Sequence, residues 1–173
     1  SFAAAPLLNF SSDTGLGFGA RAKLARLEGG VQPYQMSLEA QAYGSTGGTQ
    51  FHFLSVDLPS LAGSGWRLDA LGGFWRNSAA HYYGLSDHPP LAAEAIDTYV
   101  EMAPVVRARA RRKLGRAFSL VLGYRFMWQV IEAPAETKLM REAPFGVKGG
   151  AFSELASGLV WDTRDDELSP TRG

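Results

Sequence analysis

The stretch Phe118–Val130, FSLVLGYRFMWQV, decides the fold class. Apolar and mostly large side chains fill one parity: Phe118, Leu120, Leu122, Tyr124, Phe126, Trp128 and Val130. The other parity carries Ser119, Gly123, Arg125 and Gln129. This alternation predicts a β-strand with an apolar and a polar face. The run is longer than the ~5–6 residues of an ordinary strand and reaches the ~9–11 of a tilted membrane strand. A β-sandwich strand also alternates, but small sandwiches rarely sustain such length.

Period-two alternation extends along most of the chain and predicts an all-β, antiparallel fold. The expected strands are Phe2–Phe10, Leu16–Leu24, Met36–Ala42, Thr49–Leu58, Trp66–Asn77, Thr98–Leu114, Ala117–Glu132 and Ala151–Thr163. With eight strands, the long connections Ser78–Asp97 and Ala133–Gly149 lie on one side and short turns on the other, as in bacterial barrels. Pro6 within the first run is compatible with an edge strand. We therefore expect an antiparallel transmembrane β-barrel with about eight long strands.

Composition narrows the function classes. Lys plus Arg equals Asp plus Glu at 17 each, so no net charge draws the chain to nucleic acid. The absence of Cys excludes disulfides, thiolate catalysis and Cys-ligated zinc. No run of about 18 apolar residues is present, which excludes a membrane-spanning helix.

The basic stretch Val106–Lys113 has two interpretations. As a linear motif it resembles a nucleic-acid or targeting patch. As a strand it places four cations on one parity: Arg107, Arg109, Arg111 and Lys113. Such a row is costly against lipid but acceptable inside a hydrated barrel. We favour a lumen-facing charged row, with Glu39 on another strand as an inward-facing carboxylate, and expect no nucleic-acid partner.

No residues with the spacing of a catalytic or metal site stand out. His52, His81 and His88 are the only histidines, and they lack metal-ligand spacing and a paired nucleophile, so loop positions for His81 and His88 are the simpler interpretation. The segment Gly15–Gly19 lacks the helix that a nucleotide-binding loop requires, and small residues that let a strand bend or pack closely explain it better. No G-x-S-x-G motif is present. We expect no catalytic residue, metal or cofactor, and a non-enzymatic role.

The end of the chain resembles a family signature. Residues 158–173, GLVWDTRDDELSPTRG, are similar to the D-x-R-D-x-x-x-x-P-x-x-G pattern of the bacterial surface-antigen (BamA/TamA-type) outer-membrane assembly factors. The matching positions are Asp162, Arg164, Asp165, Pro170 and Gly173. Residues 6–20, PLLNFSSDTGLGFGA, resemble the first barrel strands of this family, and residues 82–87, YYGLSD, resemble a recurrent loop segment.

The resemblance implies a location in the bacterial outer membrane and a role in assembly, insertion or translocation of outer-membrane proteins. Family barrels usually have 16 strands, so residues 1–173 are expected to be the N-terminal half of a barrel, without a POTRA domain. The implied partners are outer-membrane lipid or lipopolysaccharide, client outer-membrane proteins and a second barrel half.

Several different barrels are compatible with the same residues. Eight strands could close alone or pair with a second copy. The chain could instead form a passive pore or structural barrel, or the membrane module of a patatin-like phospholipase fusion. A soluble ligand-binding barrel would require the large apolar faces to point inward.

Overall fold

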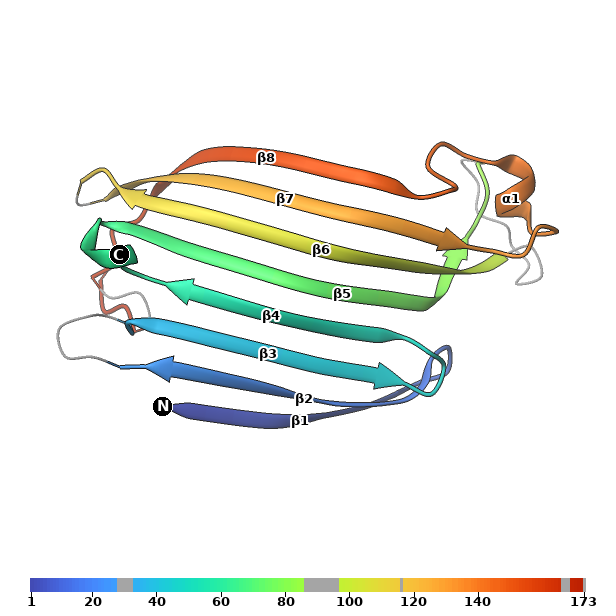
Figure 1. Cartoon of the computed structure of the whole chain (residues 1–173), viewed down its shortest axis with the longest axis horizontal. Helices are drawn as coiled ribbons and strands as arrows, with labels where there is room; N and C mark the ends of the chain where they lie inside the picture. Colours follow the sequence, from blue (N-terminus) through green and yellow to red (C-terminus); the bar gives the residue numbers. More distant parts are fainter. Residues whose placement is uncertain (28–32, 86–96, 116, 166–168, 173) are drawn as a thin grey trace.

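Eight antiparallel strands follow one another along the chain and pair in sequence order in the computed structural model (Figure 1). The structure describes residues 1–27, 33–85, 97–115, 117–165 and 169–172. The strands are β1 (Phe2–Ser11), β2 (Gly15–Arg26), β3 (Met36–Ser45), β4 (Gln50–Leu58), β5 (Trp66–Tyr82), β6 (Asp97–Lys113), β7 (Phe118–Glu132) and β8 (Gly150–Trp161). A 3₁₀ turn, η1 (Leu61–Gly63), and one short helix, α1 (Lys138–Glu142), complete the described elements. The predicted all-β antiparallel fold with eight long strands is confirmed.

The register of the strands keeps each parity on one side of the sheet. Arg109 of β6 lies opposite Asp69 of β5 and opposite Gly123 of β7. The next residue, Ala110, lies opposite Leu68 and Leu122. Because alternate side chains point to opposite faces, polar residues collect on one face and apolar residues on the other.

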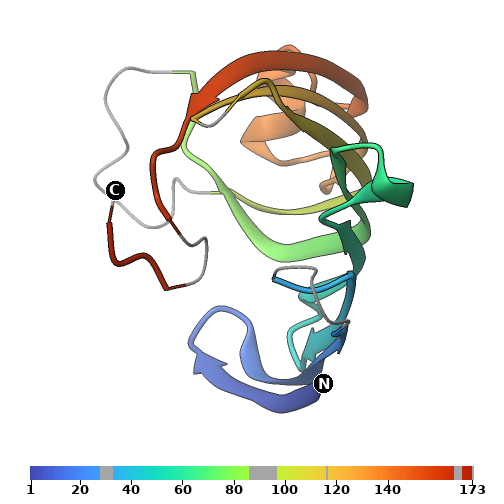
Figure 2. The ribbon, with the colours of Figure 1, turned by 90° about the vertical axis from the view of Figure 1, so that its left-hand side faces the viewer.

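The sheet is curved and open. Viewed along the strands it forms an arc from β1 to β8, and the segment after β8 lies on the concave side (Figure 2). Each strand pairs only with its neighbours in sequence, so β1 and β8 form the two edges and do not pair with each other.

The connections differ between the two ends of the strands. The connection between β5 and β6 and the one between β7 and β8, which contains α1, lie at the same end (Figure 1). We call this the loop end, and the end with η1 and the β6–β7 connection the turn end. The predicted placement of both long connections on one side is confirmed. Within the second connection, the Thr137 side chain caps the first turn of α1 by accepting a hydrogen bond from the Met140 N–H.

Strand β5 extends furthest beyond the range that the alternation predicted. Strand β5 continues to Tyr82, through residues 78–82 that were expected to be loop. The register with β6 shifts between Asn77 and Ala80, which marks a β-bulge or similar irregularity. This shift breaks the period-two pattern, so the alternation in the sequence stops at Asn77 although the strand continues to Tyr82.

Candidate functional site: the two faces of the sheet

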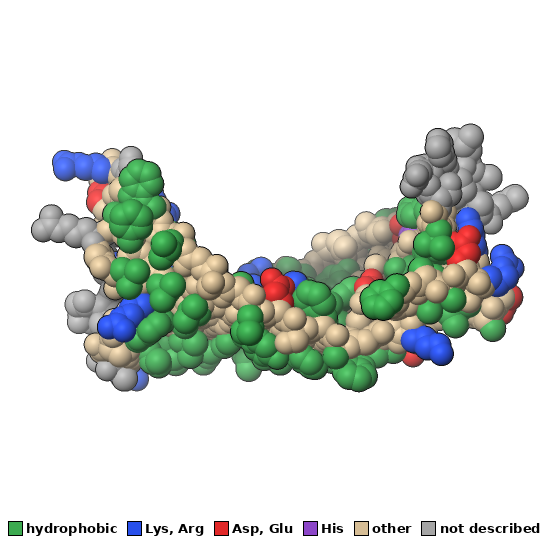
Figure 3. Space-filling view, turned by 90° about the horizontal axis from the view of Figure 1, so that it is seen from above, with side chains coloured by type: hydrophobic (Ala, Val, Ile, Leu, Met, Phe, Trp, Pro, Cys, Tyr) green, Lys and Arg blue, Asp and Glu red, His purple; other side chains and the backbone are tan. Residues whose placement is uncertain are grey.

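The convex face is apolar and exposed. Large side chains of this face are open to solvent, including Leu155 at 85%, Leu8 at 76% and Leu54 at 60%. The space-filling view shows hydrophobic side chains along the convex side of the sheet (Figure 3). Among the described residues the buried apolar side chains are few and mostly small: Ala25, Ala80, Ala103 and Leu139. A one-layer sheet of this kind has no core of its own, so its stability requires an apolar environment or a covering layer.

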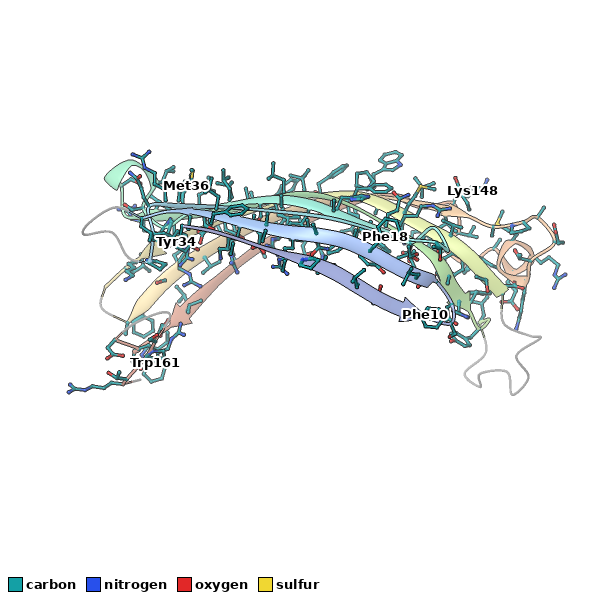
Figure 4. The ribbon with its side chains drawn as sticks, turned by 90° about the horizontal axis from the view of Figure 1, so that it is seen from below. Phe10, Phe18, Tyr34, Met36, Lys148 and Trp161 are labelled. Carbon is teal, nitrogen blue, oxygen red and sulfur yellow. The ribbon has the colours of Figure 1, made fainter. Side chains whose placement is uncertain are left out.

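Charged groups on the convex face lie near the ends of the strands. By strand register, the Arg, Glu and His side chains with this parity are Arg26 and Arg112 near the turn end, and His52, His81, Arg76 and Glu132 near the loop end. Aromatic side chains also mark both ends. Figure 4 shows Phe10 and Phe18 toward the loop end and Trp161 toward the turn end. Between the two ends, the described convex strands carry only uncharged, mostly apolar residues.

The concave face carries the charges. Arg107, Arg109, Arg111 and Lys113 share this face, as the predicted row requires. Arg112 interrupts them in sequence, but it points to the convex face, where its guanidinium lies 5.4 Å from the centre of the Trp66 ring. The soluble ligand-binding barrel requires the large apolar faces to point inward, whereas here they are convex.

Carboxylates on neighbouring strands pair with Arg107 and Arg109 of this row and with other cations of the same face. Asp69 of β5 lies 3.4 Å from Arg107 and 3.5 Å from Arg109. Glu154 of β8 lies 2.6 Å from Arg125 of β7. Glu39 of β3 lies on this same face, where it forms an ion pair with Arg21 of β2. Each of these pairs connects two adjacent strands of the sheet.

A second polar cluster includes residues that the sequence analysis did not single out. Arg67 donates to both oxygens of Asp57, at 2.9 and 2.7 Å, and the Tyr34 hydroxyl donates to Asp57 Oδ2 at 2.6 Å. Asp57 and Asp69 also lie opposite each other in the register of β4 and β5. In the sequence, Asp57 and Asp69 are single acidic residues in strands that are otherwise mostly apolar. Their parity predicts which face of the sheet they occupy, but it does not predict which cation they bind.

The segment of the family signature folds back toward the charged row. Strand β8 ends at Trp161, and Asp162 then accepts two hydrogen bonds from the Arg164 guanidinium, at 2.9 and 2.7 Å. The Arg164 guanidinium, followed by the Arg164 backbone N–H, holds the pKa of Asp162 well below its usual value. Asp162, Arg164 and Asp165 line a hollow together with Arg111 and Lys113.

Asp165 binds Thr171 and Arg172, near the end of the same segment. Its carboxylate accepts the Thr171 hydroxyl at 2.5 Å and the backbone N–H groups of Thr171 and Arg172 at 2.9 and 3.1 Å. The Thr171 hydroxyl, together with these N–H groups, lowers the pKa of Asp165. Pro170 lies within this turn, directly before Thr171. Gly173, the last position of the signature, lies outside the described residues.

The histidines do not form a site. His52 is stacked on Phe74 with ring centres 6.4 Å apart, and His81 is stacked on Tyr83 at 6.3 Å. The expected loop position of His81 is therefore wrong, because β5 extends through it. His88 lies outside the described residues. Within the part of the chain that the structure describes, no group of His, Asp or Glu side chains has the geometry of a metal site.

Both edges of the sheet expose backbone groups. Ser1 and Ala25 exchange two hydrogen bonds, at 2.6 and 2.8 Å, so the odd residues of β1 bond to β2. The even residues of β1 direct their backbone groups to the free edge, and Pro6 is one of them. Its missing N–H therefore removes no bond to β2, which explains why this strand accepts a proline. The bond from Asp162 N to Ala117 O similarly leaves the odd residues of β8 facing its free edge.

Comparisons with known proteins add no relative. No protein-family model and no curated protein matches this sequence. Among the described residues, no helix has the length and apolar character needed to cross a bilayer.

Proposed function

We propose that this chain forms an eight-strand segment of a transmembrane β-barrel in the bacterial outer membrane. The observation that carries the proposal is the division of charge between the two faces: the convex face is apolar and exposed, and the concave face holds paired charges. A lipid-facing band flanked by aromatic residues, with a polar interior, is the side-chain arrangement of outer-membrane barrels.

The length of the apolar face supports a bilayer. The apolar series of β7 runs from Phe118 to Val130, and at ~3.3 Å per residue it extends for roughly 40 Å. A strand tilt of about 40° shortens this to roughly 30 Å along the membrane normal, close to the thickness of the hydrocarbon core. The charged convex residues near the strand ends, such as Arg112 and Glu132, then lie at the two interfaces.

The free edges indicate that further strand pairing completes the barrel. In a bilayer each unpaired backbone group costs several kcal/mol, because no water is present to satisfy it. Both β1 and β8 present a row of such groups. We propose that this segment is half of a 16-stranded barrel, as the family resemblance implies. Closure of β8 on β1, which run antiparallel, and pairing with a second copy would satisfy the same groups.

The proposed role, by the same resemblance, is assembly, insertion or translocation of outer-membrane proteins, without an enzymatic step. The exposed edge of β1 supports this role physically, because unpaired backbone groups attract a partner strand. Photo-cross-linkers at the even positions of β1, such as Leu8, test it. Cross-links to a nascent outer-membrane protein support the role, and cross-links only to this chain's own β8 contradict it.

A passive pore is the second candidate. The observation that favours it is the surplus of cations on the concave face, with Arg107 and Arg109 sharing the single carboxylate of Asp69. In planar bilayers this function predicts anion-selective channels whose selectivity is lost or reversed by Arg109→Glu. Absence of conductance contradicts the pore and leaves the assembly role in place.

The membrane location is tested with single cysteines, since the chain has none of its own. Leu122→Cys places a fluorophore on the convex face, and Val121→Cys places the same fluorophore on the concave face at nearly the same depth. In liposomes we expect spin-labelled lipid chains to quench the Leu122 label and aqueous iodide to quench the Val121 label. Quenching of both labels by iodide alone would overturn the membrane proposal.

A further inference from the structure

The concave face contains a group of like charges that its own carboxylates do not neutralise. In the register of β5 and β6, Arg67 and Arg111 are direct cross-strand partners. Like charges in such pairs destabilise a sheet. Arg67 is bound to Asp57, and Arg109 shares Asp69 with Arg107. No hydrogen bond or ion pair connects Arg111 to a carboxylate among the described residues.

Arg111 is also the least solvated member of the row. Its side chain is half-buried, whereas Arg107, Arg109 and Lys113 are exposed. A partly buried cation that no carboxylate binds directly is costly, because it has lost water without gaining a hydrogen-bond partner. Asp162, in the segment after β8, lines a hollow with Arg111 and attracts it electrostatically, but both of its oxygens are bound by the Arg164 guanidinium.

A small hollow lies where these cations meet. Arg67, Asp69, Arg109 and Arg111 line a space of about 60 Å³ between β5 and β6. This volume equals that of roughly two waters and suits one compact oxyanion. Arg111 also lines the adjoining hollow of about 120 Å³, together with Lys113, Ser119 and the segment after β8.

We propose that this hollow, the Arg111 site, binds the phosphate group of a small ligand, as the free ion or as a phosphomonoester. Guanidinium groups from two strands surround the hollow. A tetrahedral oxyanion with up to four acceptor oxygens and up to two negative charges bonds to several guanidiniums at once, which a planar carboxylate does less well. The bound phosphate relieves the repulsion between Arg67 and Arg111 and gives Arg111 a directly bound anion. This proposal depends on a solvent-accessible concave face and does not require the membrane function.

The sequence supplies a matched control. Arg111 and Arg112 are adjacent, carry the same charge and lie on the same strand, but Arg112 points to the convex face beside Trp66. The variants Arg111→Gln and Arg112→Gln therefore change the net charge equally. Only Arg111→Gln removes a donor from the site.

Isothermal titration of the full chain, refolded in detergent micelles at low ionic strength, tests the proposal. Inorganic phosphate and glycerol 1-phosphate are titrated separately, and the tighter ligand identifies the free ion or the phosphomonoester as the source. We expect Arg111→Gln to weaken binding by about tenfold or more, the effect of losing a charge-assisted hydrogen bond, and Arg112→Gln to weaken it less than about twofold. No binding to the unmodified chain, or equal weakening by both variants, would overturn the proposal.

Circular dichroism shows whether Arg111→Gln folds, and a second variant tests the site if it does not. Arg109→Gln removes a guanidinium that lines the same hollow and is exposed, so its loss affects folding less. We expect the affinity of Arg109→Gln for phosphate to be severalfold lower than that of Arg112→Gln. Binding that is unchanged in Arg109→Gln contradicts the site. Because the lipid-quenching experiment depends on the convex face alone, its failure and the failure of phosphate binding are distinguishable.

Discussion

The Tyr43 hydroxyl donates a 2.7 Å hydrogen bond to Asn9 Oδ1 and so joins β3 to β1 across the strand between them. Gly17 of β2 lies beneath this bond. A Cβ atom at Gly17 would overlap both the Tyr43 hydroxyl and Asn9 Oδ1, and one at Gly19 would overlap the backbone of Ala42. The glycines therefore provide space for an aromatic side chain and for close strand approach on the concave face. This finding confirms the prediction that small residues in Gly15–Gly19 serve packing.

Gly17→Ala is expected to destabilise the sheet by about 1–3 kcal/mol, because it overfills a packed position and breaks the Tyr43–Asn9 bond. The measurement is the urea midpoint in detergent micelles. Gly158→Ala is the matched control, since Gly158 lies on the same face of β8 with open space around its Cβ position. It should change stability by less than about 0.5 kcal/mol. Equal midpoints for the two variants would contradict the packing role of Gly17.

Leu155→Arg tests the apolar convex face. If β8 spans a bilayer, a convex arginine near mid-strand is expected to cost roughly 2–4 kcal/mol in lipid vesicles. Ala156→Arg, one residue later, places the same side chain on the concave face beside Glu154 and should be tolerated. Folding equilibria in lipid vesicles give both values. A cost that is the same for the two variants would argue against a lipid-facing convex side.

Asp69→Asn tests the charge pairing on the concave face. Asp69 contacts Arg107 and Arg109, which are each about half exposed. Its removal leaves two neighbouring cations without their shared partner, and we expect a loss of up to about 1 kcal/mol at low salt. The loss should nearly vanish at 1 M salt, where the screening length falls to about 3 Å. A loss that does not depend on salt would indicate a packing role for Asp69.

Acidification is expected to release α1 from β5. Glu142 accepts the Tyr82 hydroxyl at 2.7 Å and the backbone N–H of Leu85 at 3.2 Å. The Tyr82 hydroxyl is the main cause that lowers the pKa of Glu142 from its ordinary value of 4.5. A lowered pKa means that this carboxylate stabilises the fold fully above the ordinary value, and that the stabilisation is lost as the pH falls below 4.5 through the folded pKa.

Hydrogen exchange of the segment 133–149 measures this release. In the unmodified chain, protection should fall as the pH drops below 4.5, after correction for the intrinsic exchange rate. Glu142→Gln should reduce protection at neutral pH and remove the added loss in acid. Protection that responds to pH equally in both proteins would show that another group controls the segment.

Alternation made much of the fold predictable. In β7 the alternate apolar residues from Phe118 to Val130 lie on the convex face. In β6 the alternate cations from Arg107 to Lys113 lie on the concave face. Each follows from the backbone geometry of a single strand, in which neighbouring side chains point to opposite sides. Pro6 was compatible with an edge strand for the same local reason, since only an edge position has an N–H that no ladder uses.

The extension of β5 and the position of His81 were not predictable in this way. The register shift between Asn77 and Ala80 depends on pairing with β6, which begins after a long connection. The signature at the end of the chain gave Asp162 and Arg164 as a motif. It did not indicate that they would line a hollow with Arg111, about 50 residues earlier in the chain.

The sequence by itself determined that the strands are long, that they are antiparallel, and that most have one apolar face and one polar or charged face. These properties are local, because they follow from side-chain parity and from the turns between adjacent strands. Only the tertiary structure decided which face is concave, which carboxylate pairs with which cation, and that Arg111 lies opposite Arg67 without a carboxylate of its own. Those features depend on the register between neighbouring strands and on the curvature of the sheet, because they involve residues that are far apart in the sequence.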